Sequence, residues 1–270
     1  MTRIRRTYVE GAHGQVHVRY TCPAASLHPP IICLHPTPLS GRCYEAFMAQ
    51  FDDRIVYALD TPGYGGSDHP PQPLSIEEYA DSLTDAILAL GFTGPVDLVG
   101  MHTGTRLAVE MALAGRLDVR RMVFVGCALY TPAERATSQA WSYDLEIPKA
   151  DDTQGAQVMR LWANFEEYRR EGVNDAMLER YLSDVLRDHA RSSWAHVGVY
   201  AHHLEERLPL IEQPVLVINA DDDLHGPTQR APDYLRNCRL VDLSPAGFGL
   251  LEVLPETCAD LVRAHLDCDD

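Results

Sequence analysis

Short apolar runs alternate along the chain with stretches of helical periodicity. The apolar runs predict strands at 7–10, 15–20, 30–34, 54–60, 96–100, 121–127, 214–220 and 239–243. The first two flank Gly11 and Gly14, which is typical of a hairpin. Helical patterns predict helices at 75–90, 103–114, 227–237 and 255–266, and Ser75 with Glu78 forms a capping-box signature at the start of the first of them.

The alternation breaks in the block from residue 131 to residue 208, where the pattern is helical and no strand is predicted. The tryptophans of the chain all fall in this block: Trp141, Trp162 and Trp194. Strand–helix alternation on both sides of the block predicts an α/β fold, with a mostly parallel sheet and helices on both faces. We expect a core of residues 1–130 and 209–270, and a helical lid at 131–208 inserted after the sixth strand. The lid should cover the carboxyl ends of the strands, where open α/β sheets place their sites.

The formal net charge is −16, from 23 Lys and Arg against 39 Asp and Glu. Charge of this sign repels nucleic acid and anionic membranes, so we expect neither as a partner. No run of about 18 apolar residues occurs, and no apolar segment follows the basic N-terminus, so we expect no transmembrane helix and no secretory signal. The seven cysteines lack zinc-site spacing, which predicts reduced thiols in a cytoplasmic protein and no metal.

Four turns that follow strands carry the candidate chemistry. They are Leu34–Pro38 (LHPTP), Asp60–Ser67 (DTPGYGGS), Val99–Gly104 (VGMHTG) and Asp221–Pro227 (DDDLHGP). With these turns in this order, the chain resembles the α/β-hydrolase superfamily over nearly its whole length, from the first hairpin to the last helix. The resemblance implies the α/β-hydrolase fold, with a site at the carboxyl ends of the strands.

The resemblance places a histidine where the family carries its nucleophile. The family's elbow reads G-x-nucleophile-x-G, because the strained turn needs small flanking residues. Gly100 and Gly104 assign the apex to His102, whereas Thr103 lacks small residues two places to either side. Some bacterial members of the superfamily are similar here, with a His-Thr-Gly turn.

The resemblance also locates the remaining parts of the family's site. Phe248 takes the position of the triad histidine, so the family's base is missing. Asp223 keeps the position of the acid, with D-x-x-x-P spacing to Pro227. By position, the N–H groups of the oxyanion hole belong to Thr37 and Thr103.

Further side chains are expected to bind the substrate under the lid. These are His35, Tyr130, Trp141, Trp162, Tyr200, His203 and Phe248. Structural interpretations stay open beside the functional ones: His102 as part of an inactive elbow, His35 as a histidine bonded to nearby backbone, and Asp223 as a helix cap. Asp221 and Asp222 are interpreted as solvated loop charges.

A histidine at the elbow cannot repeat the serine mechanism, since no second histidine is placed to accept and return a proton. Against an apolar wall of Phe248 and Leu250, the imidazole is expected to stay neutral and basic. Beside an oxyanion hole, such a base suits the formation of an enolate or alkoxide. Our first hypothesis is non-covalent acid–base catalysis by His102, with Asp223 as a second acid–base group. The reaction would be elimination, isomerisation, cyclisation or water-mediated hydrolysis of a small apolar carbonyl compound.

Two other functions stay open. The second hypothesis is hydrolysis of an ester, lactone or amide, with His102 activating water or accepting the acyl group. The third is a catalytically inactive protein that binds a small ligand.

No dinucleotide fingerprint and no GxxxxGK[ST] motif occurs, so no cofactor is expected. A small molecule is the expected partner, and a homodimer through the lid or an edge strand is left open.

Overall fold

A computed structural model describes residues 3–26, 28–146, 155–243 and 246–268. These residues form an eight-stranded sheet in the order β1-β2-β4-β3-β5-β6-β7-β8. The pairs β1–β2 and β2–β4 are antiparallel, and the pairs from β4 to β8 along the sheet are parallel. The predicted α/β fold with a mostly parallel sheet is confirmed.

Each predicted strand is present, with bounds that differ by a few residues. The strands are β1 Ile4–Gly11, β2 Gly14–Thr21, β3 Ile31–Leu34, β4 Val56–Leu59, β5 Val96–Met101, β6 Val119–Val125, β7 Val215–Asn219 and β8 Cys238–Asp242. Helices α1 Glu45–Met48, α2 Ile76–Ala89, α3 Thr103–Leu113 and α9 His225–Thr228 lie between strands, and α10 Leu250–Val253 and α11 Pro255–Leu266 follow β8. The capping box at Ser75 is present, because its side chain accepts from the N–H of Glu78 and the Glu78 side chain accepts from the Ser75 N–H.

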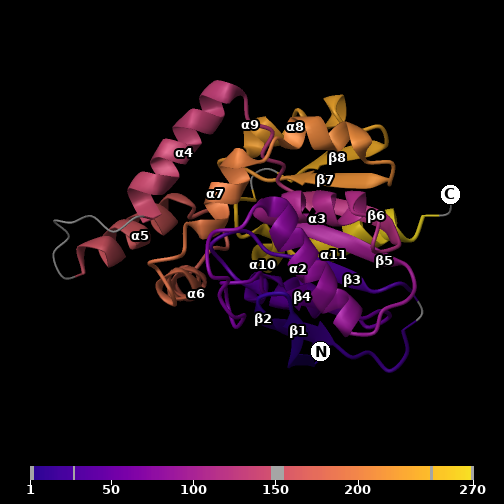
Figure 1. Cartoon of the computed structure of the whole chain (residues 1–270). Helices are drawn as coiled ribbons and strands as arrows, with labels where there is room; N and C mark the ends of the chain where they lie inside the picture. Colours follow the sequence, from indigo (N-terminus) through magenta and orange to yellow (C-terminus); the bar gives the residue numbers. More distant parts are fainter. Residues whose placement is uncertain (1–2, 27, 147–154, 244–245, 269–270) are drawn as a thin grey trace.

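The sheet is buried on both faces, as its continuous apolar strands predict. Alternate residues of β3 show this, because successive side chains of a strand point to opposite faces. Ile32 and Leu34 belong to the apolar cluster that includes α2 and α3, while Ile31 and Cys33 belong to the cluster that includes α1, α10 and α11. Figure 1 shows α2 and α3 lying together over the sheet.

The prediction of a helix at 227–237 is wrong. The segment forms the short α9 and a 3₁₀ turn at Ala231–Asp233 instead. Pro232 lies inside the segment, and a proline has no N–H to donate and clashes with the carbonyl four residues before it. A continuous helix therefore cannot pass through this position without a kink.

Helices fill the chain between β6 and β7. They are α4 Pro132–Glu146, α5 Ala156–Glu167, α6 Asp175–Leu186, α7 Trp194–Ala201 and α8 Leu204–Arg207. Figure 1 shows α4, α5 and α6 gathered at one end of the sheet, away from the end of the chain marked C. The division into a core and a lid at 131–208 stays a prediction, and residues 147–154 lie outside the described residues. In the described parts of the chain, no helix is both long enough and apolar enough to cross a membrane.

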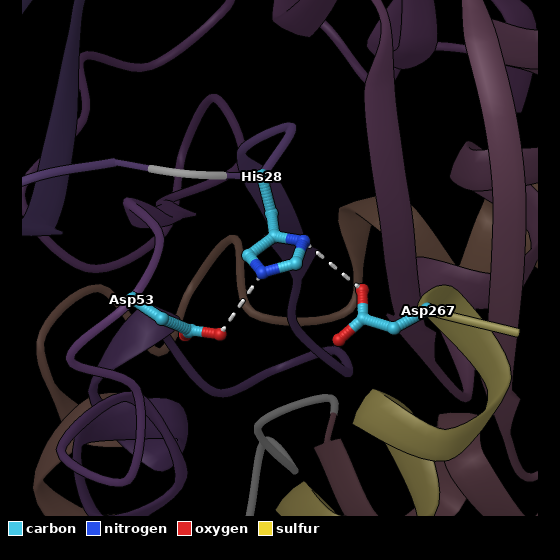
Figure 2. Close-up of side chains that lie close together, drawn as sticks. All are labelled: His28, Asp53 and Asp267. Carbon is cyan, nitrogen blue, oxygen red and sulfur yellow. Dashed lines mark ion pairs between the residues drawn. The ribbon is translucent and has the colours of Figure 1, made fainter.

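Ion pairs connect the end of α11 with the segments that precede β3 and β4. His28 lies between two carboxylates, with Nε2 3.7 Å from Asp53 and Nδ1 3.5 Å from Asp267 (Figure 2). The fully buried guanidinium of Arg54 donates to the same two carboxylates, at 3.0 Å and 2.6 Å. This cluster contains two acidic and two basic side chains, so we interpret it as a structural ion-pair network.

Candidate active site

The turn between β5 and α3 is a strained elbow with His102 at its apex. His102 has φ 51° and ψ −107°, the only positive φ of a non-glycine residue in the part of the chain that the structure describes. A Cβ at Gly100 would lie 2.4 Å from the Gly104 carbonyl oxygen, and a Cβ at Gly104 would lie 1.9 Å from the Leu34 carbonyl oxygen. The two glycines are thus required by close backbone approach, and the predicted geometry of the turn is confirmed.

His102 is paired with Asp222, a residue that the sequence reasoning missed. Its Nε2 lies 3.0 Å from Asp222 Oδ2, and the other oxygen, Oδ1, accepts from the Leu224 N–H at 2.9 Å. The side chains of His102 and Asp222 are 13% and 2% exposed. The interpretation of Asp222 as a solvated loop charge is therefore wrong. In a run of three aspartates, the direction of the turn decides which carboxylate points inward, and the sequence does not show that direction.

Gly126 determines which edge of the His102 ring faces the pocket. This glycine follows β6 with φ +74°, and a Cβ on it would lie 2.8 Å from His102 Cδ2 and 3.1 Å from Nε2. The Cδ2–Nε2 edge is thus packed against backbone and against Asp222. Nδ1 has no hydrogen-bond partner among the described residues, and it is not sealed from solvent. With Asp222 ionised, Nε2 carries the proton and the lone pair of Nδ1 is available to a ligand.

The electrostatics of the site differ from the sequence prediction. Burial acts to lower the pKa of His102, but the charge and hydrogen bond of Asp222, with the charge of Asp223, outweigh it and raise the pKa. The prediction that an apolar wall keeps the ring neutral is therefore wrong in direction. The protein packed around the Asp223 carboxylate and the repulsion of Asp222 likewise raise the pKa of Asp223, although the nearby imidazole acts against them.

Phe248 supplies that apolar wall. Its ring meets the His102 ring edge-on, with the centroids 5.2 Å apart and the planes at 87°. Tyr168 and Tyr181 contact the other parts of the Phe248 ring, at 5.3 Å and 5.8 Å between centroids. A phenyl ring here can pack against the imidazole but can transfer no proton.

The two predicted oxyanion residues lie next to each other at the elbow. The Thr37 N–H reaches the Thr103 hydroxyl oxygen at 3.4 Å, a long hydrogen bond that a better acceptor can replace. The N–H of Thr103 is the first of α3, so no helical carbonyl precedes it to accept its hydrogen bond. Both side chains line the same pocket as His102.

This pocket has a volume of about 110 Å³. It lies between the elbow and the inserted helices, and most of its lining is aromatic or aliphatic. The predicted site residues that line it are Thr37, His102, Thr103, Tyr130, Trp141, Tyr200, Asp223 and Phe248. Several of them also line a second, more open cavity of about 500 Å³: Tyr130, Trp141, Tyr200 and Asp223. Asp223 is solvent-exposed and lines both cavities.

Three predicted substrate-binding residues do not reach the pocket. His35 is buried, and both ring nitrogens are used: Nδ1 bonds the Pro36 carbonyl at 2.9 Å and Nε2 accepts from the Thr61 N–H at 2.9 Å. His203 is exposed at the start of α8 and bonds Glu205. Trp162 packs against the core instead. The structure therefore does not bring these three residues to the pocket.

The rotation of α5 about its axis explains why Trp162 does not line the pocket. The α5 residues at the pocket, together with the residue that caps the helix, follow a helical spacing: Leu161, Asn164, Phe165 and Tyr168. Side chains separated by three or four residues share one helix face, so the neighbour of Leu161 points elsewhere. The same spacing was visible in the sequence, but it does not show which face meets the substrate. His196 and Arg106 also line the pocket without having been predicted there.

Among the described residues, three groups of side chains bring potential metal ligands within 4.8 Å of one another. Two of them already contain a guanidinium: the cluster of Figure 2, and Glu77, Glu110 and His202, where Arg207 donates to both oxygens of Glu110. The third consists of His102, Asp222 and Asp223 at the pocket. There, His102 Nε2 and Asp222 Oδ2 lie 3.0 Å apart, at hydrogen-bond distance from each other.

The comparisons with known proteins agree on the fold. A model of the alpha/beta hydrolase family matches residues 31–261. Microperfuranone synthase of Emericella nidulans is 31% identical over 103 residues, which is 38% of this chain. The matched segment spans only 11% of that protein.

Solved structures resemble this one over nearly its full length. An esterase from Exiguobacterium antarcticum has a TM-score of 0.81 at 15% identity, covering 98% of this chain and 100% of that one. A carboxylesterase from Bacillus subtilis has a TM-score of 0.80 at 18% identity, covering 98% and 92%. A haloalkane dehalogenase from Agrobacterium tumefaciens C58 has a TM-score of 0.75 at 20% identity, covering 97% and 96%. At such identities the likeness shows the fold alone, and these names cover different reactions.

Proposed function

Because the chain belongs to the alpha/beta hydrolase family, we propose that it is an enzyme that acts on a small carbonyl compound by acid–base chemistry at His102, without a covalent intermediate. One observation carries the proposal. His102 is oriented through Nε2 by Asp222, while Nδ1 has no partner in the described part of the chain and His102 lines a pocket. This is the arrangement of a general base whose ring is held by a carboxylate.

The proposed reaction begins with proton removal by His102. Nδ1 takes a proton from a carbon next to the substrate carbonyl, or from a water that attacks the carbonyl, and the ring becomes an imidazolium. The Asp222 carboxylate, 3.0 Å from Nε2, stabilises that positive charge. The electron pair moves onto the carbonyl oxygen, where the N–H groups of Thr37 and Thr103 stabilise the negative charge.

Asp223 supplies the second acid–base group. Its raised pKa increases the fraction that is protonated, and it lines the pocket together with His102. Two titratable groups in different surroundings support separate acid and base roles. Asp223 then gives a proton to a leaving group or to a second carbon. At the end of the cycle the imidazolium loses its proton to solvent and the Asp223 carboxylate takes one up, so both groups return to their starting states. Elimination, isomerisation, cyclisation and water-mediated hydrolysis all fit this sequence.

Phe248 takes the position of the family's triad histidine and cannot transfer a proton, which favours non-covalent chemistry. A serine mechanism requires a nucleophile and a separate histidine, and here the elbow holds the histidine and a phenyl ring packs against it. The pocket volume of about 110 Å³ is below the roughly 150 Å³ of a cavity that admits benzene, so the buried part of the substrate is small.

The test is carbon-acid exchange, since it needs no knowledge of the natural substrate. Small ketones and aldehydes are incubated with the enzyme in D₂O, and deuterium uptake next to the carbonyl is followed by NMR. We expect uptake with the wild type, a loss of about 10²–10⁴-fold in His102→Gln, and no change in His203→Gln. His203 is a matched control because its side chain is 58% exposed and lies outside the pocket. Undiminished exchange in a folded His102→Gln protein would contradict the proposal.

Hydrolysis of an ester or lactone is the second candidate. The oxyanion donors and the fold shared with esterases favour it. Mass spectrometry after mixing with p-nitrophenyl acetate distinguishes its two forms, because an acyl group on His102 adds mass and water activation does not. If small carbonyl compounds raise the melting temperature while neither exchange nor hydrolysis occurs, the protein is an inactive ligand-binding member of the family.

A further inference from the structure

Arg106 is a buried cation in the wall of the pocket. It lies on the first turn of α3, four residues after His102 in the chain. The side chain is 1% exposed and is among the largest buried side chains of the protein. It lines the pocket together with His102 and the two threonines.

The guanidinium keeps hydrogen-bond donors unused. Nη1 donates to His202 Nδ1 and to the His202 carbonyl, both at 3.0 Å, and Nη2 donates to the Ala128 carbonyl at 2.8 Å. Nε is buried and has no partner among the described residues. The Nε–H and one Nη2–H thus remain, and a guanidinium edge with two N–H donors matches the two oxygens of a carboxylate.

The charge of Arg106 is also uncompensated. No carboxylate of the described residues lies within ion-pair distance of it, and its hydrogen bonds go to two carbonyls and a histidine nitrogen. The acidic side chains nearby have other partners, since Glu110 bonds Arg207 and His202 while Glu205 bonds Arg135. Burial lowers the pKa of Arg106 to about 10, which still leaves it charged at neutral pH. A buried charge without a counter-ion is unfavourable unless a ligand supplies one.

We propose that the substrate carries a carboxylate, which pairs with the Arg106 guanidinium in the pocket wall while the reacting carbonyl lies at His102 and the two threonine N–H groups. The inference rests on the proposed function and adds the substrate class to it. His102 and Arg106 line one pocket of about 110 Å³, so only a few bonds separate the carboxylate from the carbonyl.

The other charged side chains of the pocket determine which end of the substrate lies beside His102. Asp222 and Asp223 lie on the His102 side, and both repel an anion. Arg106 lies four residues further along the chain, beside Ala128 and His202. A carboxylate-bearing molecule therefore binds with its anionic end toward Arg106, which leaves its neutral carbonyl beside the base.

The test compares carboxylates with their neutral amides of equal size. Acetate and propanoate are titrated into the wild type by calorimetry, each against acetamide or propanamide, with the melting temperature as a second readout. We expect each carboxylate to bind at least tenfold more tightly than its amide. Equal binding, or a preference for the amides, would overturn the inference whatever the variants show.

Variants assign the preference to Arg106. In Arg106→Gln the carboxylate preference is expected to disappear, and in Arg106→Lys, which keeps the charge and loses the paired donors, it is expected to fall but persist. A protonated His102 can also attract anions, so His102→Gln is the control, and the preference should survive in it. A preference that disappears in His102→Gln, or that survives in Arg106→Gln, would overturn the inference. If His102→Gln keeps both the preference and full activity, the proposed function fails while the carboxylate site stands.

Discussion

Gly126→Ala tests the orientation of His102 without altering any catalytic group. Two effects are expected from the structure. An alanine at φ +74° adopts a left-handed backbone at a cost of about 1–2 kcal/mol. Its Cβ would also lie 2.8 Å from His102 Cδ2, so the ring must move away from the position in which Nε2 bonds Asp222. Losing a hydrogen bond to a charged group adds about 1.5–3 kcal/mol, for a total of about 2.5–5 kcal/mol.

Gly115→Ala is the matched control. Gly115 has φ +64° at the end of α3, and a Cβ on it would meet no atom within 4 Å. The backbone effect of about 1–2 kcal/mol is therefore shared by both variants, and the difference between them measures the contact with His102.

The assays are urea unfolding for stability and deuterium exchange of a small ketone for activity. We expect Gly126→Ala to be less stable than Gly115→Ala by about 1.5–3 kcal/mol and to lose about 10²-fold in rate, since a small misplacement of a reacting group has this effect. Gly115→Ala should keep the wild-type rate. Equal stabilities together with full activity in Gly126→Ala would refute the assignment of the Cδ2–Nε2 edge to the Gly126 side.

Further predictions concern the buried carboxylates. Asp222→Asn removes the charge that raises the pKa of His102, so the rise of activity with pH should begin at lower pH than in the wild type, with a lower plateau rate; unchanged profiles would exclude Asp222 as the orienting group. Because the pKa of His102 is raised in the folded state, its pair with Asp222 stabilises the fold fully below about pH 6.5, and this stabilisation is lost as the pH rises through the folded pKa. In urea unfolding, Asp222→Asn should therefore lose less free energy of unfolding, relative to the wild type, at pH 9 than at pH 6. Asp60→Ala should destabilise by about 3–5 kcal/mol, since Asp60 accepts from Arg19 and from the N–H groups of Gly41 and Gly66, and urea unfolding measures the loss. The lowered pKa of Asp60 means that its contribution is present above about pH 3.9 and fades as the pH falls further, so an acid titration of the wild type should show this loss and Asp60→Ala should not.

The sequence predicted the parts of the molecule that depend on local pattern. Apolar strands and helix signals showed the sheet, and the glycines at 100 and 104 showed the elbow, because close backbone approach leaves a glycine at a defined position. Orientation was not predictable in the same way. Asp222 and Asp223 are neighbours of one type, and only the course of the loop after β7 turns Asp222 toward His102. For α5, the sequence showed an amphipathic helix. It did not show which face of the helix packs against the core and which face lines the pocket.

Several unfavourable features coincide at this one pocket. A non-glycine residue with φ 51° costs about 1–3 kcal/mol, and two carboxylates share a single imidazole. Four residues further along the chain, the Arg106 guanidinium is buried without a counter-ion from the described residues. An inactive elbow would lose nothing by relaxing these features, since a glycine at position 102 relieves the backbone strain and an uncharged side chain at position 106 removes the unpaired charge. Because the chain maintains all of them beside an open pocket, and because each has a use in binding or proton transfer, their coincidence favours a working site over a structural remnant.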